Sequence, residues 1–314
     1  MNKALIIGAG GVGQSSAGSL VARGWDVVLA SRSGATPSLP EVRGIQLDAT
    51  DPDAVTKAAE GMDVLINAVN PKNYARWDRD WPPIASAILT AAGRHRLNLV
   101  TVSNLYGYGK VSAPMTEETP MNPNGSKGAV RAQMWYDALA AHEAGQIKAT
   151  EVRPSDYFGP GANPLVSMVN TFIIKRAAAG KTVWMPFGRP DAPHSWSYLE
   201  DIAELVAVVA TDDRSWGRPW HVPTAPPRTA TELANDVADI VGGPKVRVRE
   251  MPAMVKKAMR VSEMIRSLDE TKHQHEEPWI LDATAAEQTF GLTPTDWHKA
   301  LSATISLAEV VRPR

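Results

Sequence analysis

Cysteine is absent from the 314-residue chain. Its absence excludes disulfide bonds, thiolate nucleophiles, cysteine-ligated zinc and iron–sulfur clusters. Long apolar runs are also missing, since no stretch reaches the roughly 18 apolar residues that cross a membrane. The apolar run Ala4–Ile7 is too short for the core of a signal peptide. We therefore expect a cytoplasmic protein with no membrane partner.

An excess of charge of either sign is missing as well. Lys and Arg number 33 and Asp and Glu number 34, which gives a formal net charge of −1. A chain without a basic surplus lacks the bulk electrostatic footprint of nucleic-acid binding. We expect a small-molecule substrate as the partner and no nucleic acid, and we leave a homodimer open.

Short apolar runs alternate with amphipathic stretches in the first half of the chain. The expected strands are Ala4–Ile7, Val27–Ala30, Ile45–Leu47, Val64–Asn67, Leu97–Val102 and, after a longer gap, Thr150–Arg153. The helices expected between them cover 15–23, 53–59, 84–92 and 128–144. Near-continuous apolar strands that alternate with helices predict an α/β fold with a doubly wound parallel (Rossmann) sheet.

The second half of the chain is less regular. Helices are expected at 165–179, 201–210, 231–241, 253–267 and 296–308, and short strands at 182–185 and 220–222. This pattern predicts a Rossmann domain over 1–160 and a smaller C-terminal α/β substrate lobe over 161–314. Because no clean linker separates the two, we expect segments of the lobe to interleave with the first domain.

A glycine-rich turn follows the first expected strand. It reads Gly8-Ala9-Gly10-Gly11-Val12-Gly13 and matches G-x-G-x-x-G in a strand–helix–strand context. The first glycine permits the tight turn, the second lets a pyrophosphate approach the backbone, and the third lets helix and strand pack closely. The N-terminus of the helix then faces the phosphates. The turn therefore predicts a dinucleotide cofactor.

The end of the second strand bears on which dinucleotide binds. NAD sites usually carry an acidic residue there, but Asp26 precedes this strand, and Ser31 and Arg32 follow it. A guanidinium and a hydroxyl suit a 2′-phosphate. We therefore expect NADP(H), with NAD(H) as the alternative.

Further cofactor positions follow from the rule that ligands sit beyond the carboxyl ends of parallel strands. The expected contacts after strands three and four are Asp48, Ala49, Asn67, Ala68 and Val69. Asp48 either accepts a hydrogen bond from the adenine amino group or caps the turn that contains Thr50; the sequence leaves both open.

Four segments resemble the atypical, extended branch of the short-chain dehydrogenase/reductases, the NAD-dependent epimerase/dehydratase family. They are Gly8–Gly13, Ser103-Asn104-Leu105-Tyr106-Gly107, Arg153-Pro154-Ser155-Asp156-Tyr157-Phe158-Gly159-Pro160 and His194-Ser195-Trp196-Ser197-Tyr198-Leu199-Glu200-Asp201. The resemblance implies a Ser/Thr, a Tyr and a Lys as the catalytic residues, with Tyr and Lys four residues apart on one helix. The lysine orients the nicotinamide ribose and lowers the pKa of the tyrosine.

The tyrosine of that pair is missing. The family's lysine resembles Lys127, and four residues before it stands Pro123. The chain's six tyrosines are Tyr74, Tyr106, Tyr108, Tyr136, Tyr157 and Tyr198. Only Tyr106 has a lysine four residues later, Lys110, but two intervening glycines disfavour a helix there.

Three explanations of the missing tyrosine remain open. Another phenol takes its place, with Tyr106 preferred over Tyr108 and Tyr157. Alternatively, Ser103 or a water donates the proton with Lys127 as electrostatic support. In the third, the protein binds the cofactor without turnover, as NmrA-like sensors do. Our expected catalytic residues are Lys127, Tyr106 and Ser103.

The resemblance also implies contacts after the sixth strand and in the 194–201 segment. We expect cofactor contacts from Pro154, Ser155 and Tyr157. The expected substrate contacts are Tyr108, Asp156, His194 and Trp196. The tract His273-Gln274-His275 lacks a third ligand at a defined spacing, so we expect no metal site.

The resulting expectation is an NADP(H)-dependent oxidoreductase that acts on a small carbonyl/alcohol pair. The first alternative is a nucleotide-sugar epimerase or dehydratase with bound NAD(P). The second is the non-catalytic dinucleotide sensor.

Overall fold

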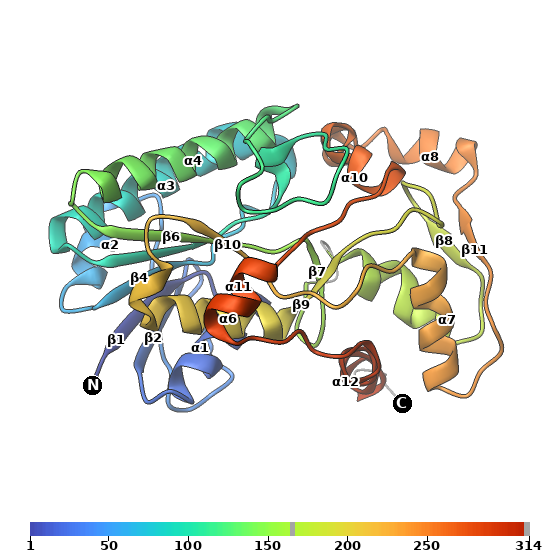
Figure 1. The fold of residues 1–314 in the computed structure, drawn as a ribbon, viewed down its shortest axis with the longest axis horizontal. Coiled ribbons are helices and arrows are strands. Elements are labelled where there is room, and N and C mark those ends of the chain that lie inside the picture. Colours follow the sequence, from blue (N-terminus) through green and yellow to red (C-terminus); the bar gives the residue numbers. More distant parts are fainter. Residues whose placement is uncertain (164–166, 311–314) are drawn as a thin grey trace.

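The main sheet lies at one end of the molecule in a computed structural model that describes residues 1–163 and 167–310 (Figure 1). Its seven parallel strands run in the order β10-β6-β5-β4-β1-β2-β3. They are β1 (Lys3–Ile7), β2 (Asp26–Ser31), β3 (Arg43–Gln46), β4 (Val64–Asn67), β5 (Asn98–Val102), β6 (Lys148–Arg153) and β10 (Pro219–His221). The predicted doubly wound parallel sheet is confirmed. The strand order reverses between β1 and β4, and that switch point is where such sheets bind ligands.

Helices cover both faces of the sheet. One face carries α2 (Pro52–Ala59), α3 (Trp77–His95) and α4 (Ser126–Glu143), and the other carries α1 (Gly11–Val21), α6 (Leu199–Thr211) and α11 (Thr284–Phe290). Apolar side chains alternate along β1, so that Leu5 packs towards the first group and Ile6 towards the second. This two-sided burial explains why the strands are almost continuously apolar.

The second lobe has its own core at the other end of the molecule (Figure 1). Two pairs of short parallel strands belong to it: β7 (Asp156–Phe158) with β9 (Trp196–Tyr198), and β8 (Val183–Met185) with β11 (Val248–Glu250). Its helices are α5 (Lys175–Ala178), α7 (Ala230–Ile240), α8 (Ala253–Met259), α9 (Glu263–Ser267), α10 (His273–Glu276) and α12 (Trp297–Val310). A π-helical turn η3 (Val169–Ile174) precedes α5, and 3-10 turns are η1 (Tyr74–Arg76), η2 (Tyr106–Tyr108), η4 (Asp213–Ser215) and η5 (Asp269–Thr271).

Chain segments cross between the two lobes. Helix α6 packs on α1, and β10 extends the main sheet next to β6. The loop after β7 approaches the start of α1, where a Cβ on Gly11 would meet the Gly161 carbonyl 2.5 Å away. The carboxyl edge of the sheet therefore faces the second lobe directly.

Several elements differ from the sequence-based expectation. Helix α3 begins at Trp77 rather than at residue 84, because the exposed Pro82 and Pro83 lie in its solvent-facing early turns, where the carbonyls left without a donor can reach water. The helix expected over 253–267 is broken into α8 and α9. The strands β7 and β9 were not expected, because three residues carry too little periodicity to predict a strand.

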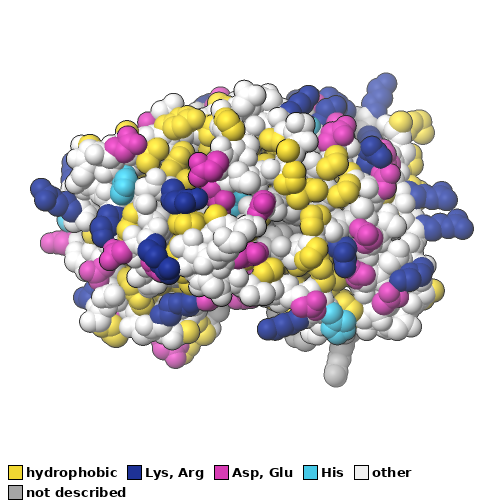
Figure 2. Space-filling model, in the orientation of Figure 1, with side chains coloured by type: hydrophobic (Ala, Val, Ile, Leu, Met, Phe, Trp, Pro, Cys, Tyr) yellow, Lys and Arg dark blue, Asp and Glu magenta, His cyan; other side chains and the backbone are white. Residues whose placement is uncertain are grey.

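Lysine and arginine side chains are prominent at the lobe end of the surface in Figure 2, where α8 and β11 lie. Helix α8 has no buried residue, and Lys256 pairs with Glu250 at 2.6 Å. No helix of the described residues is long and apolar enough to span a membrane.

A buried polar network fastens the C-terminal segment to the sheet. The Glu151 carboxylate accepts a hydrogen bond from Arg153 Nε at 2.6 Å, and both side chains are 2% exposed. Arg153 also donates to the Tyr108 hydroxyl, which lies 2.7 Å from His221 Nε2. The other ring nitrogen of His221 lies 2.8 Å from the Asp282 carbonyl. A neutral His221 satisfies this chain, donating to Asp282 and accepting from Tyr108.

The network predicts acid lability. Burial lowers the pKa of His221 to about 4, below the roughly 6.5 of an unfolded histidine. The unfolded chain therefore takes up this proton first, so the stabilisation from His221 is complete above pH ~6.5 and is lost as the pH falls towards 4. Urea unfolding of the wild type between pH 7 and 4 should show a steeper loss of stability than His221→Gln. The exposed His298→Gln control should follow the wild type; equal slopes for wild type and His221→Gln would contradict the assignment.

Candidate active site

The glycine-rich turn lies at the switch point of the sheet. Gly8 has a φ of 117°, a conformation that favours glycine, and a Cβ on it would overlap the backbone of Ala68 at the end of β4. A Cβ on Gly13 would overlap the Gly8 carbonyl. The two glycines thus permit the close approach of turn, helix and neighbouring strand that the motif predicts.

The residues at this turn fit a dinucleotide. A Cβ on Gly10 would meet no atom within 4 Å, so the backbone there borders open space. Among the described residues no side chain caps the N-terminus of α1, which leaves its first N–H groups for an anion. The remaining predicted cofactor positions lie along the same edge and are Val12, Ser31, Ala49, Asn67, Val69 and Pro154.

The end of β6 adds an unsatisfied hydroxyl to this edge. Ser155 is 5% exposed, and its backbone N–H donates to Ser197 Oγ at 3.0 Å. Its own Oγ is buried and finds no hydrogen-bond partner among the described residues. Such a group is the kind that a polar ligand satisfies.

The end of β2 carries an exposed guanidinium. Arg32 follows Ser31 and is exposed. Asp48 Oδ1 accepts hydrogen bonds from the N–H and the hydroxyl of Thr50, at 2.9 and 2.8 Å, and these bonds lower its pKa. This oxygen therefore serves the local turn, which is one of the two roles expected for Asp48.

Lys127 lies in the first turn of α4, and its ammonium is engaged by the second lobe. Nζ lies 2.5 Å from Glu270 Oε1 and 2.7 Å from the Ser267 carbonyl, and the side chain is 3% exposed. The Glu270 carboxylate also accepts from the Lys127 N–H at 3.3 Å. The structure therefore shows Lys127 paired across the lobe boundary rather than free at the cleft.

Pro123, at the position of the missing tyrosine, contacts the start of α4. A Cβ placed on Gly128 would lie 2.9 Å from the Pro123 Cβ. The same Cβ would also meet the Tyr106 carbonyl oxygen. The turn that carries Tyr106 therefore packs on the first turn of α4, next to Lys127. If Tyr106 replaces the missing tyrosine, its turn must lie close to Lys127, and the structure places the two segments together.

Tyr106 belongs to a small aromatic group with Trp77 and Tyr74. The Tyr106 ring stacks on that of Trp77, with the ring centroids 5.9 Å apart. The ring centroid of Tyr74 lies 4.5 Å from that of Trp77. Burial raises the pKa of Tyr106 well above its ordinary value, and the negative charge of Asp156 acts in the same direction. Burial likewise raises the pKa of Tyr157. These phenols therefore stay protonated near neutral pH.

A buried arginine lies behind this aromatic group. Arg131 stacks its guanidinium 4.1 Å from the Trp81 ring and 5.1 Å from Trp77. Burial lowers the pKa of Arg131 to about 10. Sequence reasoning missed Arg131, although its place four residues after Lys127 on one helix was a usable signal.

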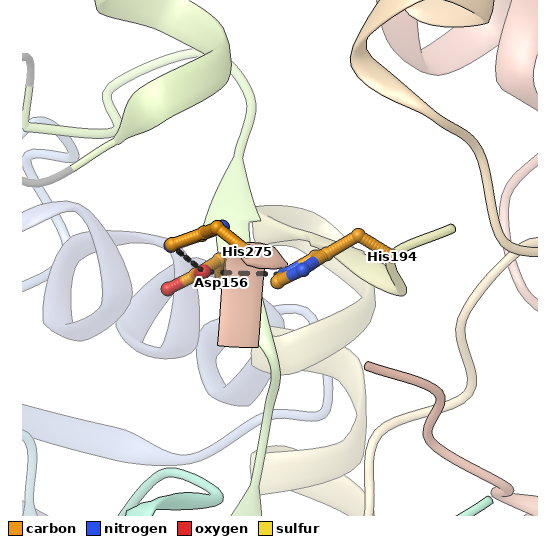
Figure 3. A group of neighbouring side chains, drawn as sticks. All are labelled: Asp156, His194 and His275. Carbon is orange, nitrogen blue, oxygen red and sulfur yellow. Dashed lines mark ion pairs between the residues drawn. The ribbon is translucent and has the colours of Figure 1, made fainter. Parts of the chain in front are cut away.

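Asp156 faces two histidines from different parts of the chain (Figure 3). Its Oδ2 lies 3.1 Å from His194 Nε2 and 3.3 Å from His275 Nε2. Burial alone would raise the pKa of Asp156, but the two facing rings hold it below its ordinary value. Burial lowers the pKa of His275 to about 4.

The structure thus brings together two predicted substrate residues, Asp156 and His194, and adds His275. Trp196 lies beside them, with its ring 4.1 Å from that of His194. The expectation for Tyr108 was wrong in its surroundings: its hydroxyl belongs to the interior network with Arg153 and His221, because η2 turns that side chain towards β6 and β10. Ser103 continues the sheet through its N–H to Val152 and is 8% exposed.

Two glycine substitutions separate folding from cofactor binding. Gly13→Ala places a methyl group against the Gly8 carbonyl and should cost about 1–3 kcal/mol of stability. Gly10→Ala faces open space, so its melting temperature should match the wild type while its dinucleotide affinity falls at least ~10-fold, or ~1.4 kcal/mol. Thermal unfolding and a fluorescence titration with NADPH and NADH measure both. Unchanged affinity in Gly10→Ala would remove the pyrophosphate from this turn.

The chain is similar to several known proteins. A profile of the NAD-dependent epimerase/dehydratase family matches residues 4–222. The chain is 25% identical over 228 residues to a dTDP-glucose 4,6-dehydratase of Streptomyces niveus; the match covers 68% of this chain and 65% of that protein, just under two thirds of its length. Protein YeeZ of Escherichia coli (strain K12) is 25% identical over 223 residues, covering 67% of this chain and 73% of YeeZ.

Solved structures share the fold of both lobes. A UDP-glucuronic acid 4-epimerase from Bacillus cereus superposes with a TM-score of 0.78 at 18% identity, over 99% of this chain and 100% of that one. A dTDP-glucose 4,6-dehydratase from Bacillus anthracis gives a TM-score of 0.80 at 16% identity, over 99% and 97% of the two chains. At these identities the likeness concerns the fold. The profile covers well over half of the chain, which therefore belongs to the NAD-dependent epimerase/dehydratase family of enzymes, the extended short-chain dehydrogenase/reductases that its sequence resembles.

Proposed function

We propose that the protein is a dinucleotide-dependent epimerase or dehydratase that acts on a nucleotide-linked sugar. The family membership carries this proposal, supported by the relatives named for activity on UDP- and dTDP-linked sugars. This activity replaces free reduction of a small carbonyl compound as the leading function. The nicotinamide, when bound, takes up or returns a hydride.

The chain's own residues divide the remaining work. In this proposal the protonated Tyr106 donates a hydrogen bond to the substrate oxygen, because its raised pKa makes it a poor base. The Asp156 carboxylate is the hydrogen-bond acceptor of the site. Lys127 reaches the ribose after its pair with Glu270 opens, and Ser103 is the family's Ser/Thr.

A second candidate is the NADP(H)-dependent reduction of a small carbonyl compound. The partly buried rings of Tyr74 and Tyr106, which both contact Trp77, favour it, because aromatic side chains at a site suit a compact apolar or ring-shaped substrate. Both candidates use the same dinucleotide turn and the same polar cluster. They differ in whether the cofactor is regenerated within one turnover.

One set of assays separates the two candidates. With UDP-glucose or dTDP-glucose, epimerase or dehydratase activity should yield an altered sugar with no net change in NADPH absorbance. Consumption of NADPH with a panel of aldehydes and ketones would instead support the second candidate. Dinucleotide binding without turnover in either assay would contradict both and support a sensor.

We propose further that NADP(H) binds more tightly than NAD(H). The solved relatives were described with NAD, but this chain has the exposed Arg32 and no acidic residue directly after β2. A charge-assisted bond to a 2′-phosphate contributes about 1.5–3 kcal/mol. The proposal therefore rests on Arg32.

Arg32→Ala tests the cofactor preference. It should weaken NADP(H) roughly 10- to 100-fold and leave NAD(H) binding within about twofold of the wild type, since only the 2′-phosphate loses a partner. Titration calorimetry with both cofactors measures the difference. Arg43→Ala is the matched control, because Arg43 begins β3 and so lies away from the carboxyl edge of the sheet. This variant should change the affinity for neither cofactor. Equal losses for the two cofactors in Arg32→Ala would refute the preference.

A further inference from the structure

Asp156 and its two histidines lie close together, but their facing atoms are not aligned as hydrogen bonds. The Nε2–Oδ2 distances of 3.1 and 3.3 Å exceed the roughly 2.7–2.9 Å of charge-assisted hydrogen bonds. Asp156 Oδ2 and His194 Nε2 are buried, and neither finds an aligned hydrogen-bond partner among the described side chains. Two buried polar atoms that face each other without a hydrogen bond indicate a bound ion or molecule between them.

The hydrogen bond made by the other ring nitrogen of His194 indicates which kind of group can bind at Nε2. His194 Nδ1 lies 2.9 Å from the Gln274 carbonyl, which can only accept a hydrogen bond. Nδ1 therefore carries a proton, so Nε2, which faces the Asp156 carboxylate, is the nitrogen that remains for a metal ion. A carbonyl behind the ring of a ligating histidine is the usual outer-shell arrangement at metal sites.

The two distances from Asp156 Oδ2 match the edges of a coordination polyhedron. Ligand atoms bound at 2.0–2.1 Å to a tetrahedral zinc ion lie about 3.3 Å apart. One ligand atom from each of Asp156, His194 and His275 lies within 4.8 Å of the other two. Figure 3 shows the carboxylate of Asp156 between the two imidazole rings, with the three side chains drawn from separate segments.

The backbone holds each side chain in place. The His194 N–H donates to the Arg228 carbonyl, and the Arg228 N–H donates back to the carbonyl of His194. His275 accepts at its carbonyl from the Arg189 N–H at 2.8 Å, and a Cβ on Gly188, whose φ is 78°, would overlap the His275 Cβ. Asp156 lies in β7, in register with Trp196 of β9. The three ligands are therefore positioned before any ion arrives.

We propose that Asp156, His194 and His275 form a binding site for a divalent transition-metal cation, with Zn²⁺ as the representative ion. Two imidazoles and one carboxylate suit Zn²⁺ and its neighbours, whereas Mg²⁺ prefers an all-oxygen set. The sequence argument against a metal rested on the lack of a third ligand near His273 and His275. The fold supplies two ligands from more distant segments.

The location gives the cation a role that rests on the proposed function. The Asp156 side chain is 24% exposed although its Oδ2 is buried, so the cluster can be reached from the solvent. A cation with three protein ligands keeps a position open for a substrate oxygen and lowers the pKa of a bound hydroxyl. Such a cation would offset the absence of the tyrosine at position 123.

Titration calorimetry of the full-length protein with ZnCl₂ tests the site without an activity measurement. One Zn²⁺ should bind per chain, and affinity should fall at least ~10-fold in Asp156→Asn, His194→Gln and His275→Gln, since even outer-shell changes produce losses of that size. The exposed His298→Gln is the matched control and should bind like the wild type. MgCl₂ should give no comparable heat.

Zinc-dependent thermal shifts and anomalous diffraction from a zinc-soaked crystal keep the test decisive if a variant folds poorly. Stabilisation by zinc in the wild type, and an anomalous peak between the three side chains, are the expected results. No binding by the wild type, a peak elsewhere, or unchanged affinity in all three folded variants would overturn the metal site. Zinc binding without sugar-nucleotide turnover would overturn the proposed function and leave the metal site standing.

Discussion

The close approach of two backbone segments at Gly8 and Gly13 is the constraint on which the site depends. Because neither residue has a Cβ, the turn after β1 lies against both the end of β4 and the first turn of α1. The N-terminus of α1 then points at the carboxyl edge of the sheet, where positive partial charge favours an anion. The second lobe closes over that same edge. Site residues from distant parts of the chain therefore meet there.

The large sheet could be predicted from the sequence because its strands are apolar on both faces. The run Val64–Asn67 matches β4 residue for residue, and Gly8–Gly13 sits in the expected strand–turn–helix context. The start of α3 could not be predicted, because Pro82 and Pro83 are usual signs of a helix boundary. The break between α8 and α9 was missed for the opposite reason, since the sequence there contains no proline or glycine to mark it.

The candidate site was only partly accessible to sequence reasoning. Asp156 and His194 could be singled out because they lie in segments with a recognisable pattern. His275 could not be joined to them, because its partners are 81 and 119 positions away and the contact depends on tertiary packing. Tyr108 illustrates the converse. It follows a strand at the expected edge, yet the 3-10 turn η2 directs its hydroxyl into the interior, where Arg153 is buried and needs partners.

The pair between Lys127 and Glu270 links ligand affinity to the position of the second lobe. The lysine belongs to the Rossmann domain, while Ser267 ends α9 and Glu270 lies in η5 of the second lobe. A ligand that uses the lysine must first displace two partners, so part of its intrinsic binding free energy is consumed in opening that contact. The apparent dissociation constant then equals the intrinsic one divided by the fraction of open molecules. Mutations around residue 270 would thus alter affinity from outside the ligand's reach.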